Sequence, residues 1–365
     1  MVLKVVKGVI RWVVLILNII AVGAMLVCVY SIYLNPSIFP NWSYLGMIAP
    51  VFIIASICFI PVWIFWKWKY ALISIVGVAL CWGSIRNYCP VNPFQGTPEG
   101  KTLKVMSYNV YMFARWTYND HWDEKTIAQY IANSDADLVC LQESENISNE
   151  TINGILTAAY PYISMSSSNS PLVLLSRYPV ISDEPIKMET ESSMAHKFNV
   201  LIDDDTVTVI NVHLESYKLN EDDKALYQKM MKESIKGEKV DTTTIDYEKS
   251  FWLLEEKLVA ANAIRSRQAD QLEQVIRSNP HRHIILCGDL NDSPISYIHH
   301  KLTKQLHDAY AESGNGPGFS YNRSGMYFRL DNILISENFH SFRAKVDKYS
   351  KESDHYPIFC TLEMH

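Results

Sequence analysis

The sequence predicts an α/β protein in which two mixed β-sheets pack face to face as a sandwich flanked by helices, preceded by an all-α transmembrane segment of three helices. Two observations carry this prediction. Residues 1–100 hold only six of the 33 basic and one of the 39 acidic side chains, and most of their length is apolar. After them, short β-rich segments recur with only a few helical patterns between them, which favours a sheet sandwich over a simple βαβ repeat.

Three apolar stretches predict the membrane helices, because about 20 helical residues cross a hydrocarbon core. They are residues 9–33, 44–66 and 70–88. Basic residues precede the first stretch, so a cleaved signal peptide is the alternative for it. Its apolar run is longer than that of a signal peptide, and two further runs follow. We therefore expect residues 1–88 to be an uncleaved transmembrane anchor.

Basic residues near the ends of these stretches predict how the anchor crosses the membrane, because Lys and Arg are retained on the cytoplasmic side. Lys4, Lys7 and Arg11 place the N-terminus in the cytoplasm. Lys67 and Lys69 place the second connection there too, whereas the first connection is uncharged. With three crossings, we expect an integral membrane protein whose remaining domain is extracytoplasmic.

Residues 89–101 are rich in proline and glycine, which predicts a linker between the anchor and one catalytic domain, residues 102–365. The uneven distribution of charge leaves residues 101–365 with a formal charge of −11. Binding to duplex nucleic acid generally needs several basic side chains that neutralise phosphates. This composition therefore argues against tight non-specific binding to DNA.

Short segments rich in β-branched and aromatic residues predict the strands of this domain. They are residues 103–110, 137–141, 172–175, 198–202, 207–213, 283–287, 327–335 and 356–362. Apolar positions at helical spacing predict helices over residues 123–133 and 253–278. A charge-rich stretch between residues 218 and 250 indicates a solvated helical excursion.

Polar side chains lie at the ends of these strands or within them, where a scaffold can present catalytic groups. They are Asn109, Glu143, His213, Asp289, Asn291, Asp331, Asp354 and His355. Carboxylate and amide oxygens bind hard cations, and imidazole exchanges protons near neutral pH. The set includes no cysteine or serine nucleophile, so it predicts metal-assisted hydrolysis of a phosphoester by water.

Six motifs between residues 104 and 362 contain these side chains. They are Ser107-Tyr-Asn-Val-Tyr, Leu141-Gln-Glu-Ser, Asn211-Val-His-Leu, Gly288-Asp-Leu-Asn, Arg329-Leu-Asp-Asn-Ile-Leu and Ser353-Asp-His-Tyr-Pro-Ile. In this order they resemble the signature blocks of the endonuclease/exonuclease/phosphatase superfamily. The resemblance covers essentially the whole catalytic domain, and it implies the same two-sheet sandwich that the strand pattern predicts independently.

The resemblance implies a metal site beside the attacking water. Glu143 would be the principal metal ligand, with Asn109 and Asp354 near the same ion. We expect Mg²⁺ as the cofactor, with Mn²⁺ or Ca²⁺ as alternatives. Asp289 would align or deprotonate the water, and Asn291 would hold a phosphoryl oxygen.

The resemblance also implies a pair of catalytic histidines, His213 and His355, that flank the scissile phosphate. Asp331 would orient His355, since a carboxylate behind an imidazole fixes its tautomer and favours its charged form. The alternative for Asp331 is an ion pair with Arg329.

The substrate stays open, because nucleases, lipid phosphodiesterases and phosphoinositide phosphatases share this catalytic set. A nuclease-like phosphodiesterase is our first hypothesis. A phospholipid or sphingolipid headgroup phosphodiesterase or phosphatase is the second, and a catalytically degenerate binding module is the third. The expected partners are a phosphoester substrate, either nucleic acid or a lipid headgroup, and the membrane; we expect no protein partner.

Overall fold

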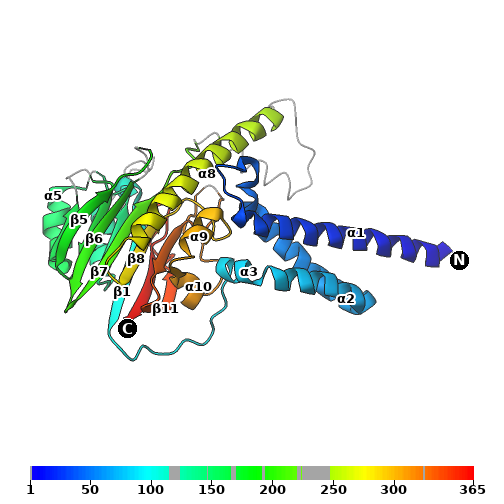
Figure 1. The fold of residues 1–365 in the computed structure, drawn as a ribbon, viewed down its shortest axis with the longest axis horizontal. Coiled ribbons are helices and arrows are strands. Elements are labelled where there is room, and N and C mark those ends of the chain that lie inside the picture. Colours follow the sequence, from blue (N-terminus) through cyan, green and yellow to red (C-terminus); the bar gives the residue numbers. More distant parts are fainter. Residues whose placement is uncertain are drawn as a thin grey trace.

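The computed structural model describes residues 2–114, 124–145, 147–165, 170–190, 194–219, 223, 247–323 and 325–365. The described residues form a domain of two β-sheets, from which apolar helices project on one side (Figure 1). Most of the predicted helical excursion between residues 218 and 250 lies outside the described residues.

The first sheet has six strands in the order β11-β12-β1-β2-β4-β3. Their bounds are β1 Thr102–Asn109, β2 Leu138–Gln142, β3 Tyr162–Met165, β4 Leu172–Ser176, β11 Phe339–Val346 and β12 Ile358–Met364. β1 and β2 run parallel, and every other neighbouring pair in this sheet is antiparallel.

The second sheet also has six strands, in the order β5-β6-β7-β8-β10-β9. Their bounds are β5 Val180–Ile186, β6 Met194–Ile202, β7 Asp205–His213, β8 His283–Asp289, β9 His307–Asp308 and β10 Asp331–Ile335. Here β7 and β8 form the parallel pair, and the remaining pairs are antiparallel. Both sheets are mixed, which confirms the predicted fold class.

Apolar side chains fill the space between the two sheets and cover their outer faces. Leu103 and Leu138 of the first sheet share one buried cluster with Phe198 and Val209 of the second. The outer face of the first sheet packs on α4, Glu124–Ala132. The outer face of the second packs on α8, Tyr247–Arg277, and α9, Tyr297–Leu302. Because each sheet is covered on both faces, β2 and β8 are buried along their whole length.

The remaining helices agree with the sequence pattern where that pattern is long. The predicted helices 123–133 and 253–278 correspond to α4 and α8, and each predicted strand region overlaps an observed strand. The other helical segments of the domain are short. Their bounds are η3 Tyr111–Ala114, α5 Asn149–Thr151, η4 Ile152–Leu156, α6 Thr157–Ala159, α9 Tyr297–Leu302 and α10 Ala309–Ser313. The strands β3, β5, β9 and β11 were not predicted.

Residues 1–88, the predicted anchor, contain two helices long and apolar enough to cross a membrane, within Val5–Tyr33 and Pro40–Leu80. The second of these is interrupted at Lys67, where two helices meet, and this break lies between the second and the third stretch that the sequence predicts. The helical elements are α1 Val2–Tyr30, η1 Ser31–Tyr33, η2 Pro40–Trp42, α2 Leu45–Leu80 and α3 Trp82–Tyr88.

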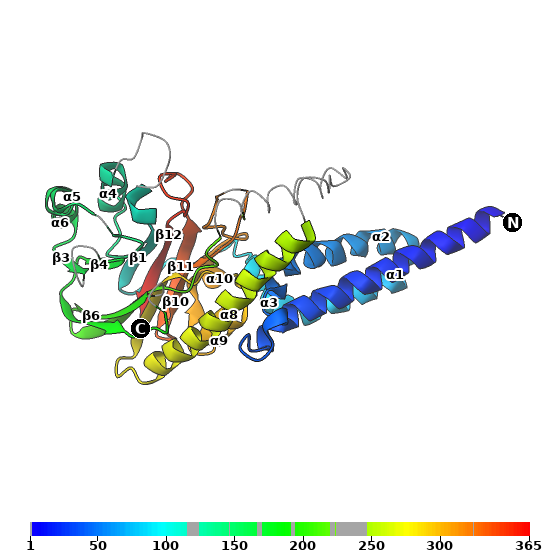
Figure 2. The same cartoon turned by 90° about the horizontal axis from the view of Figure 1, so that it is seen from above.

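The long helix α2 doubles back at Lys67, whose backbone is non-helical (φ −156°, ψ 84°). Ala49 and Cys81 belong to one apolar cluster with Met25 of α1. A straight helix would hold Ala49 and Cys81 about 48 Å apart, at 1.5 Å per residue. The anchor is thus a compact bundle, and the N-terminus of α1 lies at its far end from the sheets (Figure 2).

The near end of the anchor packs on the second-sheet side of the domain. The Tyr44 hydroxyl donates a hydrogen bond to Glu255 of α8 at 2.6 Å. Gly46, in the first turn of α2, lies so close to Ile295 that a Cβ at position 46 would be 1.7 Å from the Ile295 carbonyl oxygen. Glycine is therefore required where α2 meets the loop that follows β8.

Candidate functional site

The register of the two sheets brings the ends of four central strands together. Asn109, the last residue of β1, pairs with Gln142 at the end of β2, and Glu143 follows directly. In the second sheet, His213 at the end of β7 pairs with Asp289 at the end of β8. Parallel neighbours end at the same edge of a sheet, which is where α/β scaffolds present functional groups.

Asn109 connects the carboxylates of the two sheets. Its buried Nδ2 donates to Glu143 Oε1 at 3.0 Å and lies 3.3 Å from Asp289 Oδ2. Its Oδ1 accepts a hydrogen bond from the backbone N–H of Tyr111 at 3.1 Å. One amide therefore fixes the position of a carboxylate from each sheet.

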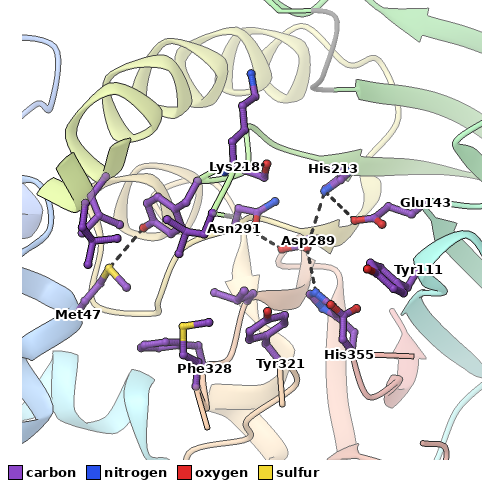
Figure 3. Close-up of a pocket in the computed structure, with 18 residues that line it drawn as sticks. Met47, Tyr111, Glu143, His213, Lys218, Asp289, Asn291, Tyr321, Phe328 and His355 are labelled. Atoms are coloured by element: carbon purple, nitrogen blue, oxygen red, sulfur yellow. Dashed lines mark hydrogen bonds and ion pairs between the residues drawn. The ribbon is translucent and has the colours of Figure 1, made fainter. Parts of the chain in front are cut away.

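Two histidines approach Asp289 from opposite sides (Figure 3). His213 Nε2 lies 3.9 Å from Asp289 Oδ2 and 3.6 Å from Glu143 Oε1. His355 Nε2 lies 3.6 Å from the same Asp289 oxygen, while its Nδ1 bonds Asp331 Oδ2 at 2.7 Å. The Asp331 carboxylate thus fixes which nitrogen of His355 faces the site, as predicted, and Arg329 instead contacts Asp308 at 3.1 Å.

Burial and nearby charges shift the pKa of two of these side chains. Burial raises the pKa of Asp289 above its usual value, and the charge of Asp331 raises it further. Burial alone would lower the pKa of His355, but the charges of Asp331 and Asp289 outweigh it and raise that pKa well above its usual value. The site therefore favours a protonated His355 beside a carboxylate that accepts protons readily.

The loop after β8 has an unusual backbone that the motif Gly288-Asp-Leu-Asn explains. Gly288 has a φ of +140°, and a Cβ there would lie 1.9 Å from the Val212 carbonyl oxygen of β7. Asn291 has a φ of +52°; its N–H donates to Asp289 Oδ1 at 2.8 Å and its side-chain Nδ2 to Leu214 O at 2.9 Å. Glu143 is also left-handed, at a φ of +49°. Such conformations cost energy and cluster at functional sites.

Asp354 completes the set from the loop before β12. Its carboxylate lies 3.7 Å from Arg323 Nη1 and lines the same cavity as Glu143, His213 and Asp289. The structure therefore brings all eight predicted side chains to one edge of the sandwich, four from each sheet or its adjoining loops.

Comparison with known protein families shows which family the domain with this site belongs to. The sequence profile of the endonuclease/exonuclease/phosphatase family matches residues 106–355, well over half of the chain. The chain belongs to the endonuclease/exonuclease/phosphatase family. Enzymes of this family are metal-dependent phosphoester hydrolases. Residues 11–88 match a second profile, which is described as a domain of unknown function, and no curated protein matches the chain.

Solved structures of this family share the fold of the catalytic domain. D. rerio TDP2 complexed with single strand DNA product is 16% identical, with a TM-score of 0.51 over 72% of this chain and 100% of that chain. A humanized D. rerio TDP2 is 15% identical, with a TM-score of 0.51 over 72% and 99%. The Beutenbergia cavernae endonuclease/exonuclease/phosphatase is 16% identical, with a TM-score of 0.49 over 72% of each chain.

The donors at this edge fit the divalent cation that enzymes of this family use. Oxygen ligands suit Mg²⁺, Mn²⁺ and Ca²⁺. Among the described residues, one group of donors lies within 4.8 Å of one another, and it consists of Asp289, Asp331 and His355. The predicted ligands are a neighbouring set, Glu143, Asn109 and Asp354. The Asp331 Oδ1 atom is buried without a hydrogen-bond partner in the described part of the chain, so a positive charge nearby would satisfy it.

The predicted residues line or adjoin a cavity of about 260 Å³. Sequence analysis missed most of the rest of its lining. The Tyr321 ring stands edge-on to His355, with ring centroids 5.0 Å apart. Tyr111 also lines the cavity, and the Arg323 guanidinium outside the lining lies 5.2 Å from the centre of its ring. Tyr111 ends the first motif and Leu330 lies in the fifth, so both could have been found there, whereas the remaining lining residues belong to no motif.

Proposed function

We propose that this chain is a membrane-anchored, divalent-metal-dependent phosphodiesterase. One observation carries the proposal: the imidazoles of His213 and His355 lie within 4 Å of a single buried carboxylate, Asp289, beside the carboxylate of Glu143. Groups that exchange protons and groups that bind a hard cation are thus combined at one site. A module that only binds a ligand would not need to combine these two kinds of group. The presence of both therefore argues against a catalytically degenerate chain.

In the reaction, Asp289 aligns a water and accepts its proton while the water oxygen bonds to phosphorus. The ester bond from phosphorus to the leaving oxygen breaks, and His355 Nε2 supplies a proton to that oxygen. His213 and Asn291 hold the non-bridging phosphoryl oxygens. Glu143, with Asn109 and Asp354 nearby, would hold the cation, which when bound stabilises the negative charge that develops on the phosphoryl group.

Nuclease-like action is the first substrate hypothesis from the sequence, and the TDP2 structure with a single strand DNA product gives it support at the level of shared fold. A phospholipid or sphingolipid headgroup is the second. The acidic character of residues 101–365 weighs against extended nucleic acid, because each neutralised phosphate needs a cation.

The experiment uses the full chain in detergent micelles with bis-p-nitrophenyl phosphate and p-nitrophenyl phosphate. We expect release of p-nitrophenolate from the diester with Mg²⁺ or Mn²⁺ and none with EDTA. His355→Ala should abolish it, and the matched change at an exposed histidine, His307→Ala, should not. If no metal supports cleavage of the diester, the proposed function is wrong, whether or not the monoester is cleaved.

We also propose that the anchor spans the membrane with the N-terminus in the cytoplasm and the catalytic domain outside. Support comes from the basic residues near the N-terminus and from the many apolar side chains that α1 and α2 expose, such as Val51 and Phe65. Alkaline phosphatase fused after His365 should be active in cells, and a fluorescent protein that folds only in the cytoplasm should stay dark there. The reverse result would contradict the orientation.

A further inference from the structure

The cavity at the site has two chemically different ends. Its polar end holds the carboxylates and imidazoles. Its other end, the apolar wall, consists of Met47, Leu219, Leu254, Leu258, Met326 and Phe328. In Figure 3, Met47 and Phe328 lie across the cavity from Glu143. The proposed chemistry involves none of the apolar wall, so its presence calls for a different explanation.

The apolar wall is built partly from the anchor itself. Met47 lies in the first turn of α2, where the Tyr217 hydroxyl is 3.5 Å from its sulfur. The contact between Gly46 and Ile295 fixes this turn against the loop that carries Asn291. The cavity is therefore continuous from the reacting groups to the helix that we propose spans the membrane.

Helix α8 provides the adjacent part of the apolar wall. Leu254 and Leu258 are four residues apart, so they share one face of α8, and both line the cavity. Between them, Glu255 accepts the hydrogen bond from Tyr44. The helix is thus held beside the start of α2 with its leucines turned to the cavity.

The charges around the cavity suit a ligand with one phosphate better than a polyanion. Lys218 is the one Lys or Arg among the described residues that line it, and its ammonium is 2.6 Å from the carboxylate of Glu215. Arg323 lies beside the lining and is 3.7 Å from the carboxylate of Asp354. Aliphatic side chains cannot neutralise the flanking phosphates of a nucleic acid strand. They do stabilise a hydrocarbon chain, because burying each methylene is favourable.

We propose that the substrate is a membrane phospholipid-type phosphodiester whose hydrocarbon chain lies on the apolar wall while its phosphate reaches Asp289 and the two histidines. This inference rests on the proposed phosphodiesterase function. Water adds to phosphorus, one ester P–O bond breaks, and the leaving alcohol takes up a proton, so the products are a phosphomonoester and an alcohol.

Three substrates with the same leaving group test this proposal on the full chain in detergent: the p-nitrophenyl phosphodiesters of ethanol, octanol and thymidine. Each releases p-nitrophenolate by the same bond cleavage, so differences report recognition of the other ester group. We expect kcat/KM for the octyl ester to exceed that of the ethyl ester by about tenfold or more, because its chain is buried on the apolar wall. The thymidine ester should resemble the ethyl ester.

Two leucine variants test the apolar wall. Leu254→Gln, which lines the cavity, should reduce the octyl-to-ethyl ratio of kcat/KM several-fold. The neighbouring Leu253 is half-exposed and does not line the cavity, so Leu253→Gln should leave that ratio unchanged. A ratio is unaffected by partial loss of folded protein, which keeps the comparison valid if a variant is less stable.

The outcomes separate the two proposals. Preference for the thymidine ester, or an octyl-to-ethyl ratio near one, overturns the lipid proposal and leaves the phosphodiesterase intact. An equal loss of the ratio in both leucine variants overturns the assignment of the apolar wall. Hydrolysis of none of the three esters overturns the phosphodiesterase and the lipid proposal with it. Cleavage of phosphatidylcholine or sphingomyelin in nanodiscs, with a single-stranded oligonucleotide uncleaved, supports both.

Discussion

The two sheets of the catalytic domain have the same plan but supply different chemistry. Each has one parallel pair at its centre, β1-β2 and β7-β8, with antiparallel neighbours. The first sheet and its loops provide Asn109, Glu143, Asp354 and His355, and the second provides His213, Asp289, Asn291 and Asp331. The decisive contacts, from Asn109 to Asp289 and from His355 to Asp331, run between the sheets. The site therefore exists only while the sheets hold their relative position.

A buried polar network maintains that position. Gln142 Nε2 of the first sheet donates to Asn211 Oδ1 of the second at 2.7 Å. Asn211 Nδ2 in turn donates to the carbonyl oxygens of Leu141 and Val173, at 2.9 and 3.1 Å. These directional bonds fix a register that apolar packing between the sheets would leave less defined.

The largest expected effect follows from removing the carboxylate that both histidines face. Asp289→Asn should lower kcat by about a thousandfold, because the variant cannot accept the proton of water. The melting temperature should not fall, since burial of the charge is what raises the pKa of Asp289. Rates measured with bis-p-nitrophenyl phosphate at saturating Mg²⁺ decide this, and a kcat within threefold of the native value would contradict the assignment.

A second test concerns the side of the domain that carries the anchor. Asp308 at the end of β9 is buried; its Oδ2 accepts from Arg329 at 3.1 Å and from His299 at 3.0 Å. Asp308→Asn leaves the Arg329 guanidinium without a counter-charge, so it should lower the free energy of unfolding by about 3 kcal/mol. The exposed Asp204→Asn should change it little. Chemical denaturation in detergent provides the measurement.

The native protein and Asp308→Asn should differ in their free energy of unfolding, and the pH dependence of that difference follows from the pKa of Asp308. Burial alone would raise that pKa, but the charge of Arg329 and the hydrogen bond from His299 lower it overall. A carboxyl whose pKa is lower in the folded state stabilises the fold above its unfolded pKa of about 3.9 and loses that effect as the pH falls through the folded value. The difference in the free energy of unfolding between the native protein and Asp308→Asn should therefore be constant from pH 5 to 8 and shrink below pH 4. A difference that grows toward low pH would contradict this.

The network between the sheets should have a smaller effect on stability. Asn211→Leu leaves Gln142 and two backbone carbonyls without partners, which should cost about 2 kcal/mol. The exposed Asn153→Leu is the matched control. Because the network also sets the register of the sheets, kcat should fall more in Asn211→Leu than the loss of folded protein explains. Equal losses of kcat and of folded fraction would mean that the network only stabilises.

The smallest effect is expected for the predicted metal ligand of the first sheet. Glu143→Gln keeps the hydrogen-bonding shape but removes a charge, so about tenfold more Mg²⁺ should be needed for half-maximal rate. The exposed Glu150→Gln should leave the Mg²⁺ requirement unchanged. A titration of rate against Mg²⁺ measures both. An unchanged requirement in Glu143→Gln would contradict its role as a ligand.

Local patterns made most strands of the sheets, and the position of the candidate site residues at their ends, predictable. Strands such as β2 and β8 are buried on both faces and read as continuous apolar runs, and a polar residue directly after such a run marks the strand end. Glu143 and Asn291 followed from this rule and from their motifs. By contrast, β5 is a mostly exposed edge strand whose polar sequence resembles a loop.

Features that depend on distant contacts were not predictable. Nothing in the sequence connects Met47 with Leu254 and Leu258, which lie more than two hundred residues away and whose helical spacing indicates ordinary packing. The orientation of the Asn109 amide, whose N–H rather than oxygen faces Glu143, follows only from the assembled site.

The absence of a side chain at Gly46 gives the anchor mechanical influence over the site. Backbone touches backbone there, so no flexible side chain can absorb relative motion between α2 and the segment from Asn291 to Ile295. A spanning helix changes its tilt with bilayer thickness. If α2 spans the membrane as we propose, such tilting would displace the amide of Asn291, and the proposed hydrolysis would then vary with the thickness of the surrounding bilayer.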